Sequence, residues 1–305
     1  MNLGVIIMNR KPLFFILFLI FLGFVFYLNA KVNFNERSAL QPSPEQNDQI
    51  SEVLSEEEET DDETLSDVLS KEDPVKEFIT EKAKAAIRAI FNKKLNIVAI
   101  GDSLTAGSGD ETNNGGYVGI LDDHLNDQID ANLTFTNLGK RGNRTDQLLQ
   151  RLEEQDIINE IEEADIILIT IGANDVMKVF QNNITRLTTD AFEEELPSFA
   201  VRLQAITDRL TTINDDANIY FIGFYNPYFH YFPEVEELDH IITTWNERIE
   251  TMTKQYDHVT FIPVKDVVDD ASFHFLAEDN FHPNYKGYEL IANEVAQYLI
   301  EKEGE

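Results

Sequence analysis

The chain has 305 residues, of which 43% are hydrophobic, and this share is sufficient for one sizeable core. Its 24 basic residues face 56 acidic ones, and the formal net charge of -32 argues against nucleic-acid binding, because such a chain repels phosphate backbones. The chain has no cysteine, which excludes disulfides, thiolate nucleophiles and zinc–thiolate sites.

Residues 1–30 are predicted to be a membrane anchor or a signal segment. Arg10 and Lys11 precede an uncharged apolar run over residues 13–28. Lipid favours such a run, and positive charges before it stay in the cytoplasm, so we expect a single-pass cell-membrane protein with its later residues outside the cytoplasm. The run is shorter than the roughly 20 residues of a comfortable span, which leaves secretion after signal cleavage as the alternative. Leu28 is bulky for a cleavage site, so a retained anchor is favoured.

Residues 31–73 are predicted to be a disordered acidic linker. Between residues 45 and 73 there are thirteen acidic residues and one basic residue, Lys71. Like charges at this density repel one another and keep a chain extended. From Pro74 the pattern becomes helical, with Val75, Phe78 and Ile79 the first of its apolar positions. Residues 74–94 are therefore expected to form an amphipathic helix that packs on a domain over residues 95–305.

From residue 95 the chain alternates between short apolar segments and helical patterns. The segments expected to be strands are residues 95–100, 133–138, 166–171, 219–224 and 259–264. Helices are expected between them, for example over residues 117–128, 144–163 and 192–213, and a last helix over 288–301. Continuously apolar strands joined by helices predict a five-stranded parallel sheet covered on both faces.

Small and polar residues follow the first three strands. Gly-Asp-Ser-Leu stands at residues 101–104, Gly139 ends the second strand, and Gly-Ala-Asn-Asp follows the third at residues 172–175. In an open parallel sheet, ligands bind beyond the carboxyl ends of the strands. The three clusters are therefore expected to meet at one site.

These clusters contain the groups that ester hydrolysis needs. Ser103, at an expected strand-to-helix turn, can act as a nucleophile, while the Gly139 backbone N–H and the Asn174 amide can stabilise an oxyanion. A base and a group to orient it stand together late in the chain, as Asp279 and His282. Taken singly, Ser103 could instead cap a helix, Asn174 could belong to a self-stabilised turn, and Asp279 with His282 could be a surface pair.

The four blocks together resemble the SGNH or GDSL-type serine hydrolases (lipases and esterases), in the order that the family has and over about residues 95–299. The resemblance implies a three-layer α/β/α, flavodoxin-like fold and hydrolysis of esters or thioesters. It carries over Ser103 as nucleophile, His282 as base and Asp279 as its orienter, with the Ser103 N–H, Gly139 and Asn174 as the oxyanion hole. The anchor and acidic linker resemble those of membrane-anchored bacterial members.

Other site types find little support in the sequence. There is no G-x-S-x-G elbow, no phosphate-binding glycine motif and no histidine spacing typical of a metal site, so no cofactor and no metal are expected. The aromatic stretch over residues 225–232 is either a wall for an acyl or aryl group or a loop whose rings pack inward.

The sequence thus predicts an extracytoplasmic, membrane-tethered serine esterase or lipase, with lysophospholipase and thioesterase activity among the options. The expected partners are an ester of a small molecule, lipid or acylated glycan, and the membrane. Nucleic acid is not expected, and nothing indicates a protein partner. The alternatives are a deacetylase of cell-envelope polysaccharide and a non-catalytic domain that binds envelope components.

Overall fold

The centre of the fold is a sheet of short apolar strands, seen in a computed structural model that describes residues 94–127, 132–186, 188–229, 231, 234–271 and 274–303. The segments expected over residues 1–30 and 31–73, and the helix expected over 74–94 apart from Lys94, lie outside these residues. In the part of the chain that is described, no helix is both long and apolar enough to cross a membrane.

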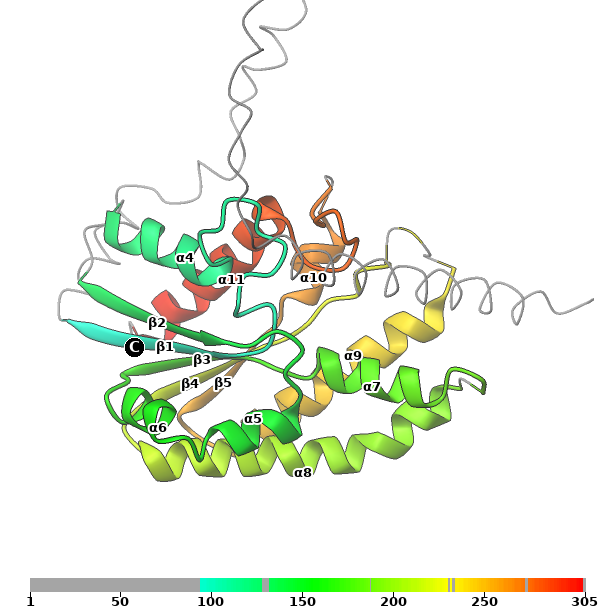
Figure 1. Ribbon diagram of the computed structural model, residues 1–305, viewed down its shortest axis with the longest axis horizontal. Helices are drawn as coiled ribbons and strands as arrows, with labels where there is room; N and C mark the ends of the chain where they lie inside the picture. Colours follow the sequence, from blue (N-terminus) through cyan, green and yellow to red (C-terminus); the bar gives the residue numbers. More distant parts are fainter. Residues whose placement is uncertain are drawn as a thin grey trace, which may run out of the picture. The chain divides into compact units, whose positions relative to one another are not determined.

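The five strands are all parallel and lie in the order β2-β1-β3-β4-β5 (Figure 1). Their bounds are Leu95–Gly101 (β1), Leu133–Gly139 (β2), Ile166–Thr170 (β3), Asn218–Ile222 (β4) and Val259–Ile262 (β5). This confirms the predicted five-stranded parallel sheet, and the strand order is that of flavodoxin-like folds. β4 ends two residues earlier than expected, because the backbone N–H and carbonyl of Phe224 bond to the side chain of Asn246 instead of to a strand.

Helices cover both faces of the sheet, which makes the three layers that the sequence predicts (Figure 1). α4 and α11 lie on one face, while α5, α8 and α9 lie on the other. The bounds are Tyr117–Asp122 (α4, continued by a π-helical turn over Asp123–Asp127), Thr145–Arg151 (α5), Gln155–Glu162 (α6), Ala173–Asn182 (α7), Thr189–Ile213 (α8), Glu236–Thr253 (α9), Lys265–Asp269 (α10) and Tyr285–Glu303 (α11).

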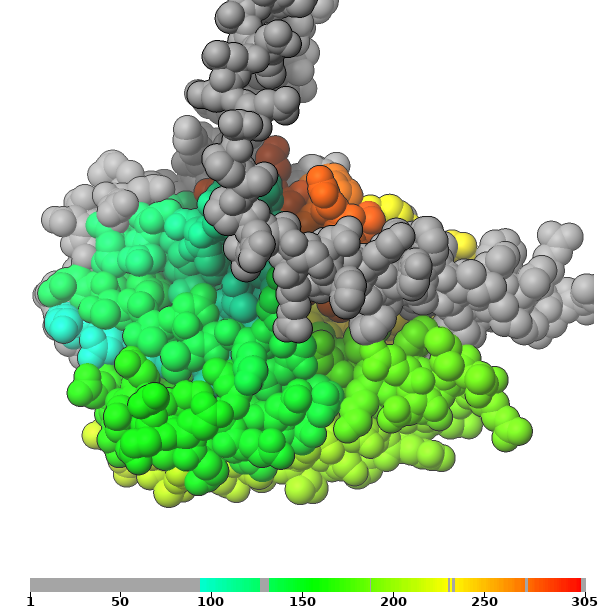
Figure 2. All heavy atoms as spheres, in the orientation of Figure 1, coloured from blue at the N-terminus to red at the C-terminus, as the bar shows by residue number. Residues whose placement is uncertain are grey.

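The helical stretch expected over residues 144–163 is confirmed, but it is divided into two helices, α5 and α6. The break lies at residues 152–154, where Leu152 is fully buried and the Arg151 guanidinium turns inward to donate to the Leu138 carbonyl oxygen at 2.7 Å. These two inward anchors change the direction of the chain. The outward sides of α5 and α6, drawn in green, form part of the surface in the space-filling view (Figure 2).

The crevice beside the end of β1 is where the sheet places a site. β2 and β3 flank β1, so the chain leaves β1 to one side and returns on the other, which opens a crevice at the carboxyl ends of β1 and β3. Only glycine fits at the end of β1: Gly101 has φ +149°, and a Cβ there would lie 2.0 Å from the Thr170 carbonyl oxygen. The close approach lets the Asp102 N–H donate to that oxygen at 3.0 Å, which holds the turn after β1 against β3.

Candidate active site

Ser103 lies in a series of turns after β1, and it does not start a helix. The expected strand-to-helix turn is therefore wrong in its second half: residues 103–109 form turns, and α4 begins only at Tyr117. Gly107 and Gly109 have positive φ values of 70° and 92°, which favour turns over a helix. The Ser103 side chain is nearly buried at 7% exposure, and a helix N-cap role does not apply to it.

His282 joins Ser103 to Asp279. The imidazole Nε2 lies 2.9 Å from Ser103 Oγ, and Nδ1 lies 2.6 Å from Asp279 Oδ2. The Asp279 carboxylate also accepts the backbone N–H groups of Phe281 and His282, at 3.0 and 2.9 Å. Burial alone would raise the pKa of Asp279, but the hydrogen bonds and the His282 charge hold it below its usual value. The three side chains thus form a continuous hydrogen-bonded line from a hydroxyl to an ionised carboxylate, the arrangement that serine nucleophiles require.

The loop with His282 reaches Ser103 because α11 is tied to the turns after β1. Tyr288 of α11 is fully buried and donates its hydroxyl to the Ser108 carbonyl oxygen at 2.8 Å. The backbone just before His282 is also held, since the Tyr225 hydroxyl donates to the Phe281 carbonyl oxygen at 2.8 Å. The contact between Ser103 and His282 spans 179 residues of sequence, so it depends on these packing contacts.

Two of the three expected oxyanion donors have a hydrogen available for a ligand. Among the described residues, the Ser103 N–H has no intramolecular acceptor. The Asn174 amide donates one hydrogen to the Asn143 carbonyl oxygen at 3.1 Å, which orients the group and leaves its second hydrogen for a ligand. Asn174 and Ser103 both line the same small cavity.

Gly139 is placed differently from the expectation. Its N–H donates to Asn137 Oδ1 at 2.9 Å, and Asn137 in turn donates its amide to the Thr105 carbonyl oxygen at 2.7 Å. A third oxyanion donor at Gly139 therefore requires that the Asn137 side chain release it. Glycine is needed here for another reason, because a Cβ would lie 2.2 Å from the Ala106 nitrogen in the turns after β1.

Asp102, next to Ser103, is a buried carboxyl at the site that the sequence did not single out. It is 2% exposed, and burial raises its pKa from 3.8 to about 6, despite hydrogen bonds from Thr170 Oγ1 (2.8 Å) and the Leu104 N–H (3.0 Å). Thr170 is itself 2.7 Å from Thr105 Oγ1, which is 3.1 Å from the Tyr117 hydroxyl. The sequence does contain a signal for this burial, because Asp102 directly follows a strand of apolar residues.

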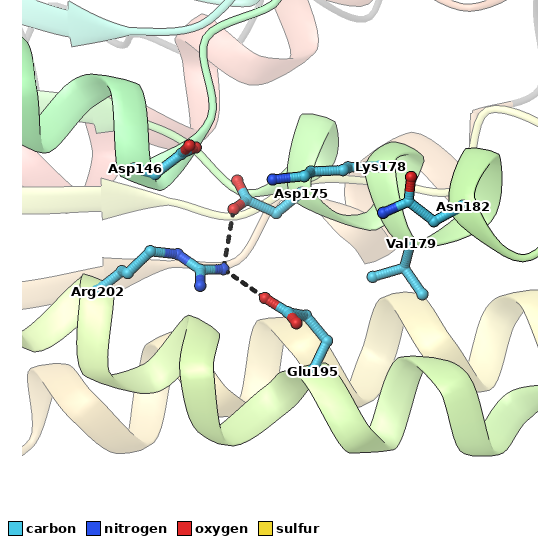
Figure 3. Close-up of a pocket in the computed structure, with 7 residues that line it drawn as sticks. All are labelled: Asp146, Asp175, Lys178, Val179, Asn182, Glu195 and Arg202. Atoms are coloured by element: carbon cyan, nitrogen blue, oxygen red, sulfur yellow. Dashed lines mark hydrogen bonds and ion pairs between the residues drawn. The ribbon is translucent and has the colours of Figure 1, made fainter.

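A second missed cluster surrounds Asp175, which directly follows Asn174. Its buried carboxylate accepts the Thr145 N–H at 2.9 Å and the Thr145 hydroxyl at 2.5 Å, and pairs with Arg202 at 3.2 Å. Figure 3 shows Arg202 reaching from α8 toward both Asp175 and Glu195. These contacts bind the start of α5 to the start of α7, and so fix the Asn143 carbonyl oxygen that orients the Asn174 amide.

The cluster borders a polar cavity of ≈ 200 Å³, lined by Asp146, Asp175, Lys178, Val179, Asn182, Glu195 and Arg202 (Figure 3). Three acidic and two basic side chains line it, and Arg202 forms ion pairs with Asp175 and Glu195. Within the described ranges, no three or more histidine, aspartate or glutamate residues are grouped so that they could hold a metal ion. The cavity therefore forms the outer side of the Asp175 cluster.

Aromatic residues after β4 close the site beside Ser103. Phe224, Tyr225 and Tyr228 are each at most 6% exposed, and Phe224, Tyr225 and Pro227 line the cavity that contains Ser103 and His282. The rings pack inward, as one interpretation expected, and a role as a wall for an acyl or aryl group stays a prediction. Tyr231, at 47% exposure, turns outward, and residues 230, 232 and 233 lie outside the described part.

Comparison with known proteins places this geometry in context. The model of the GDSL-like Lipase/Acylhydrolase family matches residues 99–290. The chain is 35% identical over 211 residues to the uncharacterized protein YpmR of Bacillus subtilis (strain 168), covering 68% of this chain and 82% of YpmR. It is 24% identical over 208 residues to the spore germination lipase LipC of Bacillus licheniformis, covering 66% of this chain and 94% of LipC.

Solved structures show the same fold. The lipase Lip_vut3 from a goat rumen metagenome has a TM-score of 0.60 at 22% identity, covering 67% of this chain and 96% of the lipase. The acetylxylan esterase Axe2 from Geobacillus stearothermophilus has a TM-score of 0.52 at 20% identity, covering 67% of this chain and 93% of Axe2.

Proposed function

The chain belongs to the GDSL-like lipase/acylhydrolase family and is a hydrolase of ester bonds, and on this premise we propose that Ser103, His282 and Asp279 are its catalytic triad. The observation that carries the proposal is the hydrogen-bonded line from Ser103 Oγ through His282 to Asp279, with contacts of 2.9 and 2.6 Å. A non-catalytic binding domain has no need of such a line, and the family argues against that alternative.

In the proposed reaction, Ser103 Oγ attacks the ester carbonyl carbon while His282 Nε2 takes its proton. Asp279 holds the imidazole in the tautomer that accepts at Nε2, and it stabilises the positive charge that forms. Collapse of the tetrahedral intermediate breaks the ester C–O bond, and His282 returns the proton to the departing alkoxide. Water then attacks the acyl-enzyme with the same base, which releases the carboxylic acid and restores Ser103.

The negative charge of the tetrahedral intermediate lies on the former carbonyl oxygen. The Ser103 N–H and the second hydrogen of the Asn174 amide are the donors that the geometry supports. Gly139 is proposed as the third donor, to be released when Asn137 turns away. Donors of this kind act mainly on the transition state, because the charge that they stabilise develops there.

Substitution of the nucleophile tests the proposal. Ser103→Ala should reduce hydrolysis of p-nitrophenyl esters by several powers of ten and abolish labelling by a fluorophosphonate probe, because the triad acts as a unit. Ser108→Ala is the matched control: Ser108 is also a buried serine in these turns, and its Oγ has no hydrogen-bond partner among the described residues. A Ser103→Ala variant that kept more than about a tenth of wild-type turnover would overturn the assignment.

We further propose that the hydrolase is tethered to the cell membrane and faces outward. Supporting this are Arg10 and Lys11 before the apolar run over residues 13–28, and the acidic stretch over residues 45–73, which can act as a spacer. Protease added to intact protoplasts should release an active soluble fragment by cutting the spacer. Protection of the enzyme would contradict the orientation, and a mature N-terminus near Lys31 would indicate secretion after cleavage instead.

Deacetylation of envelope polysaccharide is a second candidate activity for the same triad. The long acidic spacer favours it, because a spacer can carry the hydrolase away from the bilayer toward a glycan. A lipase or lysophospholipase activity would instead keep the site near the lipid surface. Release of acetate from acetylated glycan, compared with release of fatty acid from phospholipid vesicles, separates the two candidates.

A further inference from the structure

The cavity beside Ser103 is small. Its volume is ≈ 30 Å³, and it is lined by Asp102, Ser103, Leu104, Ala173, Asn174, Phe224, Tyr225, Pro227, Phe281 and His282. A cavity needs roughly 10–15 Å³ of such volume to hold one water molecule, so this cavity accepts roughly two groups of that size. A methyl group and a carbonyl oxygen fill it.

The reaction itself keeps the acyl part of the ester beside Ser103. The leaving alcohol must lie next to His282 Nε2, which gives it a proton, and it must then depart so that water can enter. The acyl group stays bound to Ser103 Oγ throughout, with its oxygen toward Asn174. The alcohol therefore takes the part of the cavity next to His282, and the part lined by Ala173, Phe224 and Pro227 remains for the acyl group.

The walls of the cavity are held by contacts on their outer sides. Phe224 is 4% exposed, and both its backbone groups bond to the Asn246 side chain, at 3.1 and 2.7 Å. Tyr225 is bonded to the Phe281 carbonyl oxygen and packs edge-on against Phe275, with 5.9 Å between ring centroids. A longer acyl chain must displace these buried rings, because close-packed side chains leave no free volume beside them.

We infer that the acyl group of the physiological ester is short, an acetyl or at most a propionyl group, because the cavity beside Ser103 holds no more than that. This inference rests on the proposed function, since it concerns the acyl group carried by Ser103. The balanced reaction is hydrolysis of an acetyl ester by water to give acetate, a proton and the free alcohol. The substrate class is thus an O-acetylated molecule and not a long-chain lipid.

A chain-length series with the full-length protein tests the inference. For p-nitrophenyl acetate, butyrate and octanoate, kcat/KM should fall by roughly 10-fold or more from acetate to butyrate, and further to octanoate, because each methylene that does not fit costs about this factor. A kcat/KM that stays level or rises toward octanoate would overturn the inference and leave the triad in place. Absence of hydrolysis of every ester, with no fluorophosphonate labelling of Ser103, would overturn the proposed function and the inference with it.

Enlarging the cavity should change the preference. Phe224→Ala should raise kcat/KM for butyrate relative to acetate by roughly 10-fold or more, and Pro227→Ala, which removes less of the wall, should move the ratio in the same direction. Phe135→Ala, in β2 and separated from β4 by β1 and β3, is the matched control and should keep the wild-type ratio. If Phe224→Ala does not fold, Pro227→Ala decides: an unchanged ratio in a folded Pro227→Ala variant would contradict the assignment of this wall to the acyl group.

Discussion

Replacing Asp102 by asparagine should stabilise the protein at neutral and alkaline pH. Burial raises the pKa of Asp102 from 3.8 to about 6, so ionising this carboxyl costs more in the folded chain than in the unfolded chain. Each pKa unit corresponds to about 1.4 kcal/mol, so the shift of roughly two units opposes folding by up to about 3 kcal/mol above pH 7. Asparagine removes the charge and keeps an oxygen to accept the hydrogen bonds from Thr170 and the Leu104 N–H.

The effect has a defined pH window. Between about pH 4 and pH 6 the folded state binds more protons at Asp102 than the unfolded state does. The contribution of Asp102 to the free energy of unfolding is therefore fully present below about pH 4 and is lost as the pH rises through about 6. Asp102→Asn should therefore raise the melting temperature by up to roughly 6–12 °C at about pH 8. The difference should close near pH 4, where the wild-type carboxyl is also neutral.

Thermal unfolding followed by circular dichroism from about pH 4 to pH 8 measures this difference. Asp110→Asn is a control of opposite sign. Burial alone would raise the pKa of Asp110, but hydrogen bonds from Thr112, Asn114 and Gly116 lower the pKa overall. The Asp110 carboxylate therefore stabilises the fold above the pKa of the unfolded chain, and this contribution is lost as the pH falls through the pKa of the folded chain. Asp110→Asn should accordingly destabilise at pH 8. An Asp102→Asn variant that is no more stable than wild type at pH 8, or equally shifted at pH 4 and pH 8, would refute the reasoning.

Two further predictions concern the oxyanion donors. Asn174→Ala should lower kcat by about 10²–10³ with only a few-fold change in KM, since its amide acts on charge that develops in the transition state; a steep rise in KM at constant kcat would instead place Asn174 in ground-state binding. Asp175→Asn should lower kcat, because its carboxylate holds Thr145 and Arg202 and thereby orients Asn174. Glu195→Gln, which changes only the more exposed partner of Arg202, should leave kcat nearly unchanged and alter stability by no more than about 0.5 kcal/mol; equal losses of kcat in both variants would show that the cluster has no special role at the site.

Much of the fold and the identity of the site could be predicted from the sequence. Each strand is a short run of apolar residues, and the preference of such runs for a buried parallel sheet is a local property that the chain carries with it. Because the sheet is parallel, the residues after β1 and β3 lie at the same end of the sheet, so the sequence alone assigns Ser103 and Asn174 to one site. Asp279 and His282 are three residues apart, and that spacing alone allows the carboxylate to reach the imidazole.

The tertiary structure decided which groups are free to act. Whether the Gly139 N–H faces a ligand depends on the Asn137 side chain, and whether Arg151 continues a helix depends on acceptors in β2 and the loop after it. No sequence pattern predicted that Arg202 of α8 would form an ion pair with Asp175. The distance between Ser103 and His282 and the ≈ 30 Å³ of space beside them likewise follow from how α11 and the segment after β4 pack on the sheet. Strand and helix preferences arise within a few residues, whereas hydrogen-bond partners, burial and cavity size arise from contacts between segments far apart in the chain, and for this reason only the folded structure determines them.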